Sequence, residues 1–246
     1  MSLIPLKIEF HSHTNLDPTD SISYNAYDLI DQAALQGFDA LAITCHDFLQ
    51  WSKKLVRYSQ TVGILLIPGL EATIEGKHVL VYGPKSFVET RTFDQLRELR
   101  ASDPNILTIA PHPYFPSNTC LGRKLLENLD CFDAIEYSHF YTKRLNFNRQ
   151  AETFARLHNK TLVGTSDVHL LNYQLGKTYT LVHTNEKSYR AIVTSVRKGL
   201  VTIETQALSP PELAGIFFRM IRVGMVGRLN KLGLLPEGTP RIYHTD

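Results

Sequence analysis

Short apolar runs rich in β-branched residues alternate along this chain with longer segments whose apolar residues recur at helical spacing. This alternation is typical of βα units, which build a parallel sheet or a barrel. The apolar runs predict strands at residues Leu6–Phe10, Ala40–Thr44, Ile64–Ile67, His78–Tyr82, Ile106–Ala110, Ala134–Glu136, Thr161–Gly164 and Thr178–Val182. We therefore expect an α/β fold.

The segments between the predicted strands favour helices. Residues Tyr24–Gln36 place apolar side chains on one helical face and stop at Gly37, which suits a helix C-terminus. Weaker patterns predict helices at Phe93–Arg100, Arg144–His158 and Ser188–Arg197. Pro210-Pro211 opens a last amphipathic segment, which we expect to be helical through Ile221.

Composition places the chain among soluble globular proteins. It has 246 residues, 43% of them hydrophobic and 20% charged, which is enough to bury a substantial core. No repeat, low-complexity tract or long linker divides it, so we expect residues 1–246 to form a single domain. No run reaches the ~20 apolar residues needed to cross a bilayer, and the N-terminus does not resemble a secretion signal.

Charge and cysteine content narrow the setting further. The net charge is +2, which gives no general reason to expect nucleic acid or an anionic membrane as the partner. The three cysteines, Cys45, Cys120 and Cys131, are odd in number and far apart, which argues against a disulfide framework or a zinc ribbon. Free thiols fit a reducing compartment, so we expect a cytoplasmic protein.

Histidines and acidic residues follow the predicted strands. His11 and His13 come directly after the first strand, and residues two apart on an extended chain face the same way, so both imidazoles can reach one ion. Residues of the same types end or follow other predicted strands: His46, Glu71, His112, Glu136, His139, Asp167 and His169. In a parallel barrel the C-terminal ends of all strands lie on one face. We therefore expect these side chains to converge.

The chemistry of this set is that of a hydrolytic metal site. Imidazole together with carboxylate suits zinc, manganese or iron, and a carboxylate can bridge two ions, for which Glu71 is the candidate. An ion with an open coordination position turns bound water into a nucleophile near neutral pH. By contrast Glu9, Asp39 and Asp133 flank strands, and we expect them at solvated or capping positions.

These motifs, in this order, resemble those of the PHP (polymerase and histidinol phosphatase) family. The segments that carry the resemblance span residues 7–169 and are His11-x-His13, Ala42–Asp47, Ile67–Glu71, Ala110–Pro113 and Gly164–His169. Within the second segment, Cys45 stands where the family usually has Asp. The resemblance implies a distorted (β/α)7 TIM-like barrel and a metal-dependent phosphoesterase activity.

The resemblance also implies two or three divalent metal ions, whose ligands follow by position. The first ion would be held by His11, His13, Glu71 and Asp167. The second would be held by Glu71, His112 and another histidine, either His78 or His139. The third would be held by His46, His169 and an acidic residue in the loop after His13, either Asp20 or Asp17.

A basic stretch follows Glu136 and offers a way to bind phosphate. Arg144 and Arg149 are preferred over Lys143 because a guanidinium binds phosphate through two hydrogen bonds. The alternative interpretation is a solvated basic helix face. We keep both open.

The resulting hypothesis is hydrolysis of a phosphate ester by hydroxide on a metal ion, with Glu71, Asp167 and His169 as the catalytic residues. His169 or His139 could protonate the leaving group. The expected partner is a small phosphorylated molecule, namely a nucleotide, sugar or amino-alcohol phosphate, or a short nucleic acid. Oligomeric state stays open.

Two other functions compete with this hypothesis. An amidohydrolase-type enzyme would share the barrel and the HxH motif, but it usually has a carboxylated lysine in the role that Glu71 takes here. A non-catalytic barrel would bind metal only for stability or for interaction with a partner.

Overall fold

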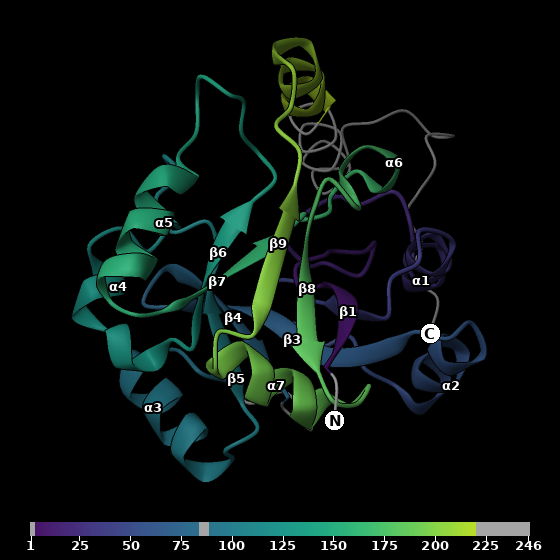
Figure 1. The fold of residues 1–246 in the computed structure, drawn as a ribbon, viewed down its shortest axis with the longest axis horizontal. Coiled ribbons are helices and arrows are strands. Elements are labelled where there is room, and N and C mark those ends of the chain that lie inside the picture. Colours follow the sequence, from purple (N-terminus) through teal and green to yellow (C-terminus); the bar gives the residue numbers. More distant parts are fainter. Residues whose placement is uncertain (1–2, 84–88, 220–246) are drawn as a thin grey trace.

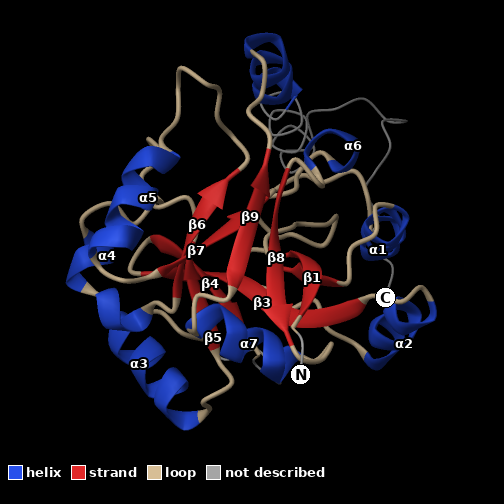
Figure 2. Ribbon diagram, in the orientation of Figure 1, coloured by secondary structure: helices blue, strands red, loops and turns tan. Residues whose placement is uncertain are grey.

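A computed structural model describes residues 3–83 and 89–219 of the chain. Within these ranges nine strands form one sheet in the order β7-β6-β5-β4-β3-β2-β1-β8-β9 (Figure 2). The strands are β1 (Ile4–Glu9), β2 (Ala40–Ile43), β3 (Leu65–Ile74), β4 (Lys77–Tyr82), β5 (Leu107–Ala110), β6 (Ala134–Ser138), β7 (Thr161–Thr165), β8 (Thr178–Thr184) and β9 (Val201–Thr205). The predicted strands are thus confirmed, and β9 is an additional one.

Helices surround this sheet. They are α1 (Ala26–Leu35), α2 (Lys53–Thr61), α3 (Phe93–Ser102), α4 (Lys124–Glu127), α5 (Asn148–Leu157), α6 (Leu171–Gln174) and α7 (Tyr189–Arg197), with a 3-10 turn, η1, at Leu129–Cys131. Helices α3, α4 and α5 lie on one side of the sheet, and α1 and α2 lie on the other (Figure 1). A further helix covers residues 210–219, and its predicted continuation to Ile221 lies outside the described residues.

The barrel is distorted because its strands do not all run the same way. Strands β1, β2 and β3 pair in parallel, as do β5, β6 and β7. Strands β4, β8 and β9 pair antiparallel with their neighbours. Strand β9 therefore runs in the direction of β1, and only β4 and β8 run the opposite way. The sequence argument assumed a parallel barrel, and this assumption is wrong for β4 and β8. The predicted α/β barrel itself is confirmed.

Gly164 in β7 lets the two edges of the sheet approach each other. A Cβ atom at this position would stand 2.6 Å from Cγ2 of Ile203 in β9 and 2.9 Å from Cγ2 of Thr178 in β8. The Thr180 hydroxyl of β8 donates to the Gly164 carbonyl at 2.8 Å and accepts its N–H at 2.9 Å. The barrel is therefore nearly closed at a place where no side chain fits.

The barrel interior is a packed core. It is filled by inward-facing strand residues, among them Ile8, Phe10, Ile67 and Ile109, each at most 1% exposed. Helix α7 packs against the same cluster at the end where β5 begins, because Arg197 donates to the carbonyl oxygen of Ile106. Each such aliphatic side chain contributes roughly 1.5–3 kcal/mol on burial. The other end of the barrel is left for polar side chains.

Two elements that the sequence pattern did not reveal have weak apolar faces. Helix α2 buries only Leu55 and Ser59, and strand β9 has no fully buried residue. No helix in residues 3–83 and 89–219 has both the length and the apolar character that crossing a bilayer would require.

Candidate metal centre

Backbone hydrogen bonds continue between neighbouring segments beyond the ends of their strands. They fix the positions of His11 and His13. The segment after β1 pairs with the segment after β7, since Val168 donates to the His11 carbonyl and His13 donates to the Val168 carbonyl, both at 3.1 Å. This pairing holds His11 and His13 against Asp167. The sequence motifs at residues 11–13 and 164–169 meet for this reason.

Backbone pairing also continues beyond β2, between the segment that follows it and β3. Glu71 donates its N–H to the Cys45 carbonyl at 3.2 Å, and Asp47 donates to the Glu71 carbonyl at 2.9 Å. His46 and Glu71 form a parallel bridge. Strand β3 runs on past this bridge, so the Glu71 side chain stands at the barrel mouth and not in the interior.

The Glu71 carboxylate lies at the centre of the cluster and is 1% exposed. Five imidazole nitrogens lie within 3.4 Å of it. Its Oε2 is 3.1, 3.2 and 3.4 Å from Nε2 of His11, His46 and His13, respectively, and its Oε1 is 2.8 Å from Nδ1 of His78 and 3.3 Å from Nε2 of His112. Such an arrangement allows one carboxylate to bridge two ions.

The antiparallel course of β4 explains the position of His78. This residue lies near the start of β4, opposite Thr73 of β3, and therefore at the same mouth as the C-terminal ends of the parallel strands. The rule that ligands follow strand ends would have placed His78 at the far end of the barrel. From the sequence, His78 was a candidate only through the resemblance to the PHP family.

Asp167 approaches the same group from β7. Its Oδ1 is 3.3 Å from Nε2 of both His11 and His13, and 3.4 Å from Nδ1 of His169. The backbone at Asp167 has φ 44°, and His112 has φ 26°. Both are in the left-handed region that costs energy for residues other than glycine, and such strain concentrates at functional sites.

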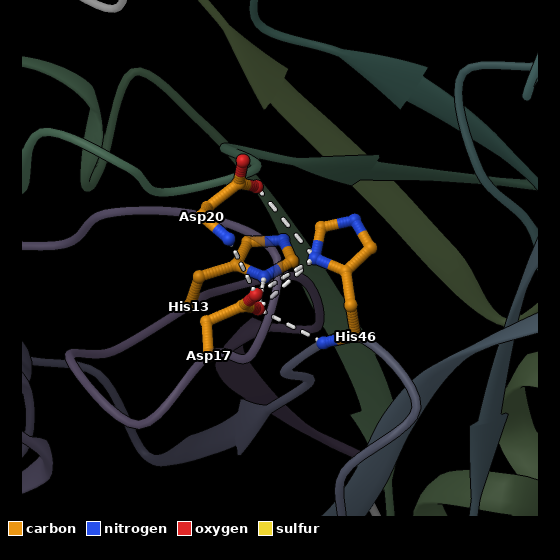
Figure 3. A group of neighbouring side chains, drawn as sticks. All are labelled: His13, Asp17, Asp20 and His46. Atoms are coloured by element: carbon orange, nitrogen blue, oxygen red, sulfur yellow. Dashed lines mark hydrogen bonds and ion pairs between the residues drawn. The ribbon is translucent and has the colours of Figure 1, made fainter. Parts of the chain in front are cut away.

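The two aspartates in the loop after His13 have different positions (Figure 3). Asp17 is buried, and its Oδ2 lies 2.8 Å from Nδ1 of His13 and accepts the His46 backbone N–H at 2.9 Å. Asp20 lines the cavity, and its Oδ2 lies 3.0 Å from Nε2 of His169 and 3.6 Å from Nδ1 of His46. Because a carboxylate only accepts, Asp17 requires the proton of His13 on Nδ1 and leaves Nε2 for an ion.

Glu136 orients His11 in the way that Asp17 orients His13, through a contact with Nδ1 of the ring. Its Oε1 lies 3.2 Å from Nδ1 of His11 and accepts from the Thr165 hydroxyl, and its Oε2 accepts the His112 backbone N–H at 2.6 Å. Carboxylates of this kind orient metal-binding imidazoles and raise their basicity. The sequence placed Glu136 at a strand end without giving it this role.

The expectation that Glu9 is solvated is wrong. It is fully buried, and its carboxylate accepts backbone N–H groups from His11 and Ser166 at 3.0 Å. Burial raises its pKa to about 8 despite these hydrogen bonds. Glu9 thus ties together the two segments that carry the HxH and Ser-Asp-x-His motifs. Asp133, likewise expected at a solvated or capping position, has a side chain that is 8% exposed and pairs with Arg100 and Arg197.

The electrostatics of the centre are dominated by opposite charges at short range. Burial alone would raise the pKa of Glu71, but the imidazoles of His11 and His46 hold it well below its usual range. Burial would likewise lower the pKa of His46 and His169, but neighbouring carboxylates raise both to about 9. In the absence of ions, protons on the imidazoles therefore balance the carboxylates.

The residues fit a bound metal ion, as three orphaned atoms indicate. Within the described ranges, Nε2 of His13, Oε1 of Glu71 and Oδ1 of Asp167 are buried and have no partner in hydrogen-bonding geometry. Buried polar atoms are rarely left unsatisfied, and a cation satisfies all three kinds at once. Nitrogen and oxygen donors without thiolate suit zinc, manganese or iron.

The remaining predicted site residues are not part of this cluster. Among the described residues, the groups whose donor atoms can share one ion include His78 and do not include His139. Arg144 and Arg149 are exposed, and neither lines the cavity. The Arg149 guanidinium contacts the Lys143 carbonyl at 3.5 Å. The phosphate-binding role of the two arginines stays a prediction.

A cavity of about 510 Å³ opens over the cluster. Ligand-type side chains form its floor, and Phe115, Phe140, Leu170 and Phe217 form apolar parts of its wall. The described residues that line it include neither lysine nor arginine. A volume of this size accommodates a small molecule or the end of a larger one.

The chain matches the PHP domain family over residues 9–210. It belongs to the PHP family. A curated relative, a PolC-type DNA polymerase III of Streptococcus thermophilus, is 38% identical over 81 residues, which are 32% of this chain and 6% of the polymerase. The chain thus spans less than a tenth of the length of these curated relatives.

Solved structures share the fold. A two-domain protein of Bacteroides vulgatus that contains a predicted PHP-like metal-dependent phosphoesterase has a TM-score of 0.65 and 20% identity, over 89% of this chain and 70% of its own. A lesion-specific endonuclease of Pyrococcus furiosus has a TM-score of 0.59 and 14% identity, over 81% and 58%. At these identities the likeness establishes the PHP fold alone.

Proposed function

We propose that this PHP-family chain is a metal-dependent hydrolase of phosphate esters that uses two or three divalent ions. The observation that carries the proposal is the buried Glu71 carboxylate, which has five imidazole nitrogens within 3.4 Å. A cluster of this density is costly unless cations satisfy it, and a multinuclear site is suited to phosphoryl chemistry.

The proposed ligand sets are the three that the resemblance to the PHP family implies. The first ion is assigned to His11, His13, Glu71 and Asp167; the second to Glu71, His78 and His112; and the third to His46, Asp20 and His169. His78 is preferred to His139 because its Nδ1 lies 2.8 Å from Glu71. Asp20 is preferred to Asp17 because it lines the cavity, whereas Asp17 already accepts hydrogen bonds from two histidines.

When bound, the ions supply an activated water and neutralise charge on the phosphoryl oxygens. Side chains of the protein orient the ligands of these ions. Asp17 and Glu136 hold the Nδ1 protons of His13 and His11, which keeps the opposite nitrogens directed at the cluster centre. Glu71, Asp167 and His169 are the proposed catalytic residues because they lie on the cavity floor.

The proposed substrate is a small phosphorylated molecule or the end of a short nucleic acid. The cavity volume of about 510 Å³ suits either, and the fold is shared with an endonuclease. Arg144 and Arg149 lie outside the cavity lining, so we assign them to contacts with parts of a substrate that extend beyond it. This supports the nucleic-acid option without selecting it.

The decisive experiment combines metal analysis with turnover. Purified protein would be analysed for bound metal and assayed with p-nitrophenyl phosphate and bis(p-nitrophenyl) phosphate. Glu71→Gln is the test variant, and Glu204→Gln, at an exposed position of β9, is the matched control. We expect two or three ions per chain and metal-dependent turnover in wild type and in the control, with both lost in Glu71→Gln.

Other outcomes would point elsewhere. Hydrolysis of amides or N-acyl compounds, but of no phosphoester, would move the protein to the amidohydrolase type. Stoichiometric metal without hydrolysis of either class would leave a metal-stabilised binding module. The ratio of the two nitrophenyl activities would separate a monoesterase from a diesterase.

A further inference from the structure

His139 is a buried cavity-lining histidine that the proposed metal centre does not use. It is 1% exposed, follows β6, and its backbone N–H donates to the Thr165 carbonyl at 3.1 Å. Its side chain lies against Gln174, with 3.2 Å between the two Nε2 atoms. Its Nδ1 is buried and has no hydrogen-bonding partner in residues 3–83 and 89–219. An orphaned polar atom in a cavity wall calls for a ligand.

The orientation of the Gln174 amide is fixed by its other neighbours. Its Oε1 accepts two backbone N–H groups, from His169 at 2.7 Å and from Leu170 at 2.6 Å. A flipped amide would set its NH₂ group against two donors, which is excluded at these distances. The NH₂ group of Gln174 must therefore point at His139.

This orientation fixes the tautomer of His139. An NH₂ group only donates, so Nε2 of His139 must be the unprotonated acceptor, and the ring proton must lie on Nδ1. The imidazole is neutral in this arrangement, because protonated Nε2 could not accept. With its Nε2 lone pair occupied, His139 is not a ligand through that atom. Its Nδ1–H is left as an unused donor.

We propose that the Nδ1–H of His139 donates a hydrogen bond to an oxygen of the bound phosphate ester, making His139 the uncharged anion-recognition residue of the cavity. This inference rests on the proposed phosphoesterase function. The cavity wall makes such a donor valuable, since the described lining residues include neither lysine nor arginine. A fixed donor aimed at developing negative charge is an effective form of transition-state stabilisation.

Two variants separate the two ring nitrogens. In His139→Asn the amide nitrogen lies two bonds from Cβ, as Nδ1 does, so the donor is kept and the contact with Gln174 is lost. In His139→Gln the amide group lies three bonds from Cβ, as Nε2 does, so the contact is kept and the Nδ1 donor is lost. Both variants carry the same neutral amide and differ from each other by one methylene group, so the comparison between them reports on where the amide lies.

The readouts are kcat/KM for bis(p-nitrophenyl) phosphate, the affinity for inorganic phosphate by calorimetry, and the metal content of the manganese- or zinc-loaded 246-residue chain. We expect His139→Gln to lose about 100-fold in kcat/KM, as for removal of one oxyanion donor, and about 10- to 100-fold in phosphate affinity. His139→Asn should stay within about tenfold of wild type. Metal content should be unchanged in both.

Several results would overturn the inference. They are equal losses in the two variants, a fall in bound metal with either, or a wild-type protein that binds no phosphate. If wild type hydrolyses no phosphoester yet binds phosphate, the proposed function fails while the affinities of the two variants still decide the role of His139. A two-bond proton–nitrogen NMR spectrum of histidine-labelled, zinc-loaded protein should show the His139 proton on Nδ1; a proton on Nε2 would contradict the argument.

Discussion

The two ends of the barrel both bury charged side chains, but they do so in opposite ways. At the end where β5 and β6 begin, Asp133 is held by Arg100 at 2.6 Å and by Arg197 at 3.0 Å and accepts the Thr108 backbone N–H at 3.0 Å. Arg197 also donates to the carbonyl of Pro104. At this end opposite charges pair directly.

At the mouth, some buried polar atoms are left without a hydrogen bond. Histidines and carboxylates lie within 3.4 Å of one another, yet three buried atoms of His13, Glu71 and Asp167 have no hydrogen-bonding partner among the described residues. In a cluster that stabilises the fold, the charged groups satisfy one another by hydrogen bonds. In a cluster that binds ions, some donor atoms have no partner within the protein and can coordinate the ion. This difference distinguishes a structural ion pair from a binding site.

The largest expected effect is the loss of the structural cluster. Asp133→Ala would leave the buried Thr108 N–H without its acceptor, and Arg100 and Arg197, whose side chains are 18% and 34% exposed, without their partner. It should lower the free energy of unfolding by about 3–5 kcal/mol. Asp130→Ala is the matched control, because the Asp130–Arg97 pair is exposed and should cost no more than about 1 kcal/mol. Urea denaturation measures both. Equal costs would show that burial does not separate the two pairs.

The metal-free protein should lose stability in alkaline solution because of the histidines at the mouth. Burial would lower the pKa of His46 and His169, but carboxylates raise both to about 9. A raised histidine pKa gives stability that is complete below about pH 6.5 and lost as pH rises through 9. Stability should fall between these values, on the order of 3 kcal/mol for each imidazole.

Asp133 has the opposite sign. Burial would raise its pKa, but hydrogen bonds from Arg100 and Arg197 lower it, so its contribution is present above about pH 4 and lost in more acidic solution. Urea denaturation in chelator at pH 2, 6 and 9 tests both. His46→Gln should flatten the alkaline loss. An unchanged free energy from pH 6 to pH 9 in wild type would count against charged imidazoles at the mouth.

Metal should stabilise the mouth specifically. At a free ion concentration of 100 times the dissociation constant, one bound ion adds about 2.7 kcal/mol, which raises Tm by roughly 5–10 °C in a protein of this size. Thermal unfolding with and without manganese or zinc measures the shift. Glu71→Gln should abolish it, and Asp133→Ala should keep it from a lower starting Tm. A shift that survives in Glu71→Gln would place the ion elsewhere.

The smallest expected effect is on metal binding, and it distinguishes Asp20, the proposed ligand, from Asp17, which orients two histidines. Asp20→Asn should remove one ion per chain even at saturating metal. Asp17→Asn should keep every ion but weaken metal affinity by about 10- to 100-fold, because His13 and His46 lose the acceptor that orients them. Metal titration followed by elemental analysis distinguishes the two. The assignment is reversed if Asp17→Asn loses an ion and Asp20→Asn does not.

Much of the fold could be predicted because most of its strands contain a continuous apolar run. Strand β2 is fully buried, and its residues appear in the sequence as a continuous apolar run. Strand β9 and helix α2 were not predicted because they bury little. The pattern of apolar residues along the sequence reflects which side chains are buried. Elements that bury few side chains therefore have no clear apolar pattern.

The histidines and acids of the candidate site were visible in the sequence, and their partners were not. His11, His46 and Asp167 each follow an apolar strand, which is a local signal. The roles of Glu9, Glu136 and Gln174 depend on contacts with residues five to 157 positions away along the chain. Such outer contacts carry no local pattern, and burial had even been predicted wrongly for Glu9.

The sequence by itself determined that this protein alternates strands and helices and that it carries the donor set of a PHP-family metal centre. The tertiary structure alone decided which donors face one another: β4 turns antiparallel and brings His78 to the mouth, and Gln174 holds His139 away from the ligand groups. The physical reason is that donor type is a property of one residue, whereas distance and tautomer are set by strand direction and by neighbours far along the chain.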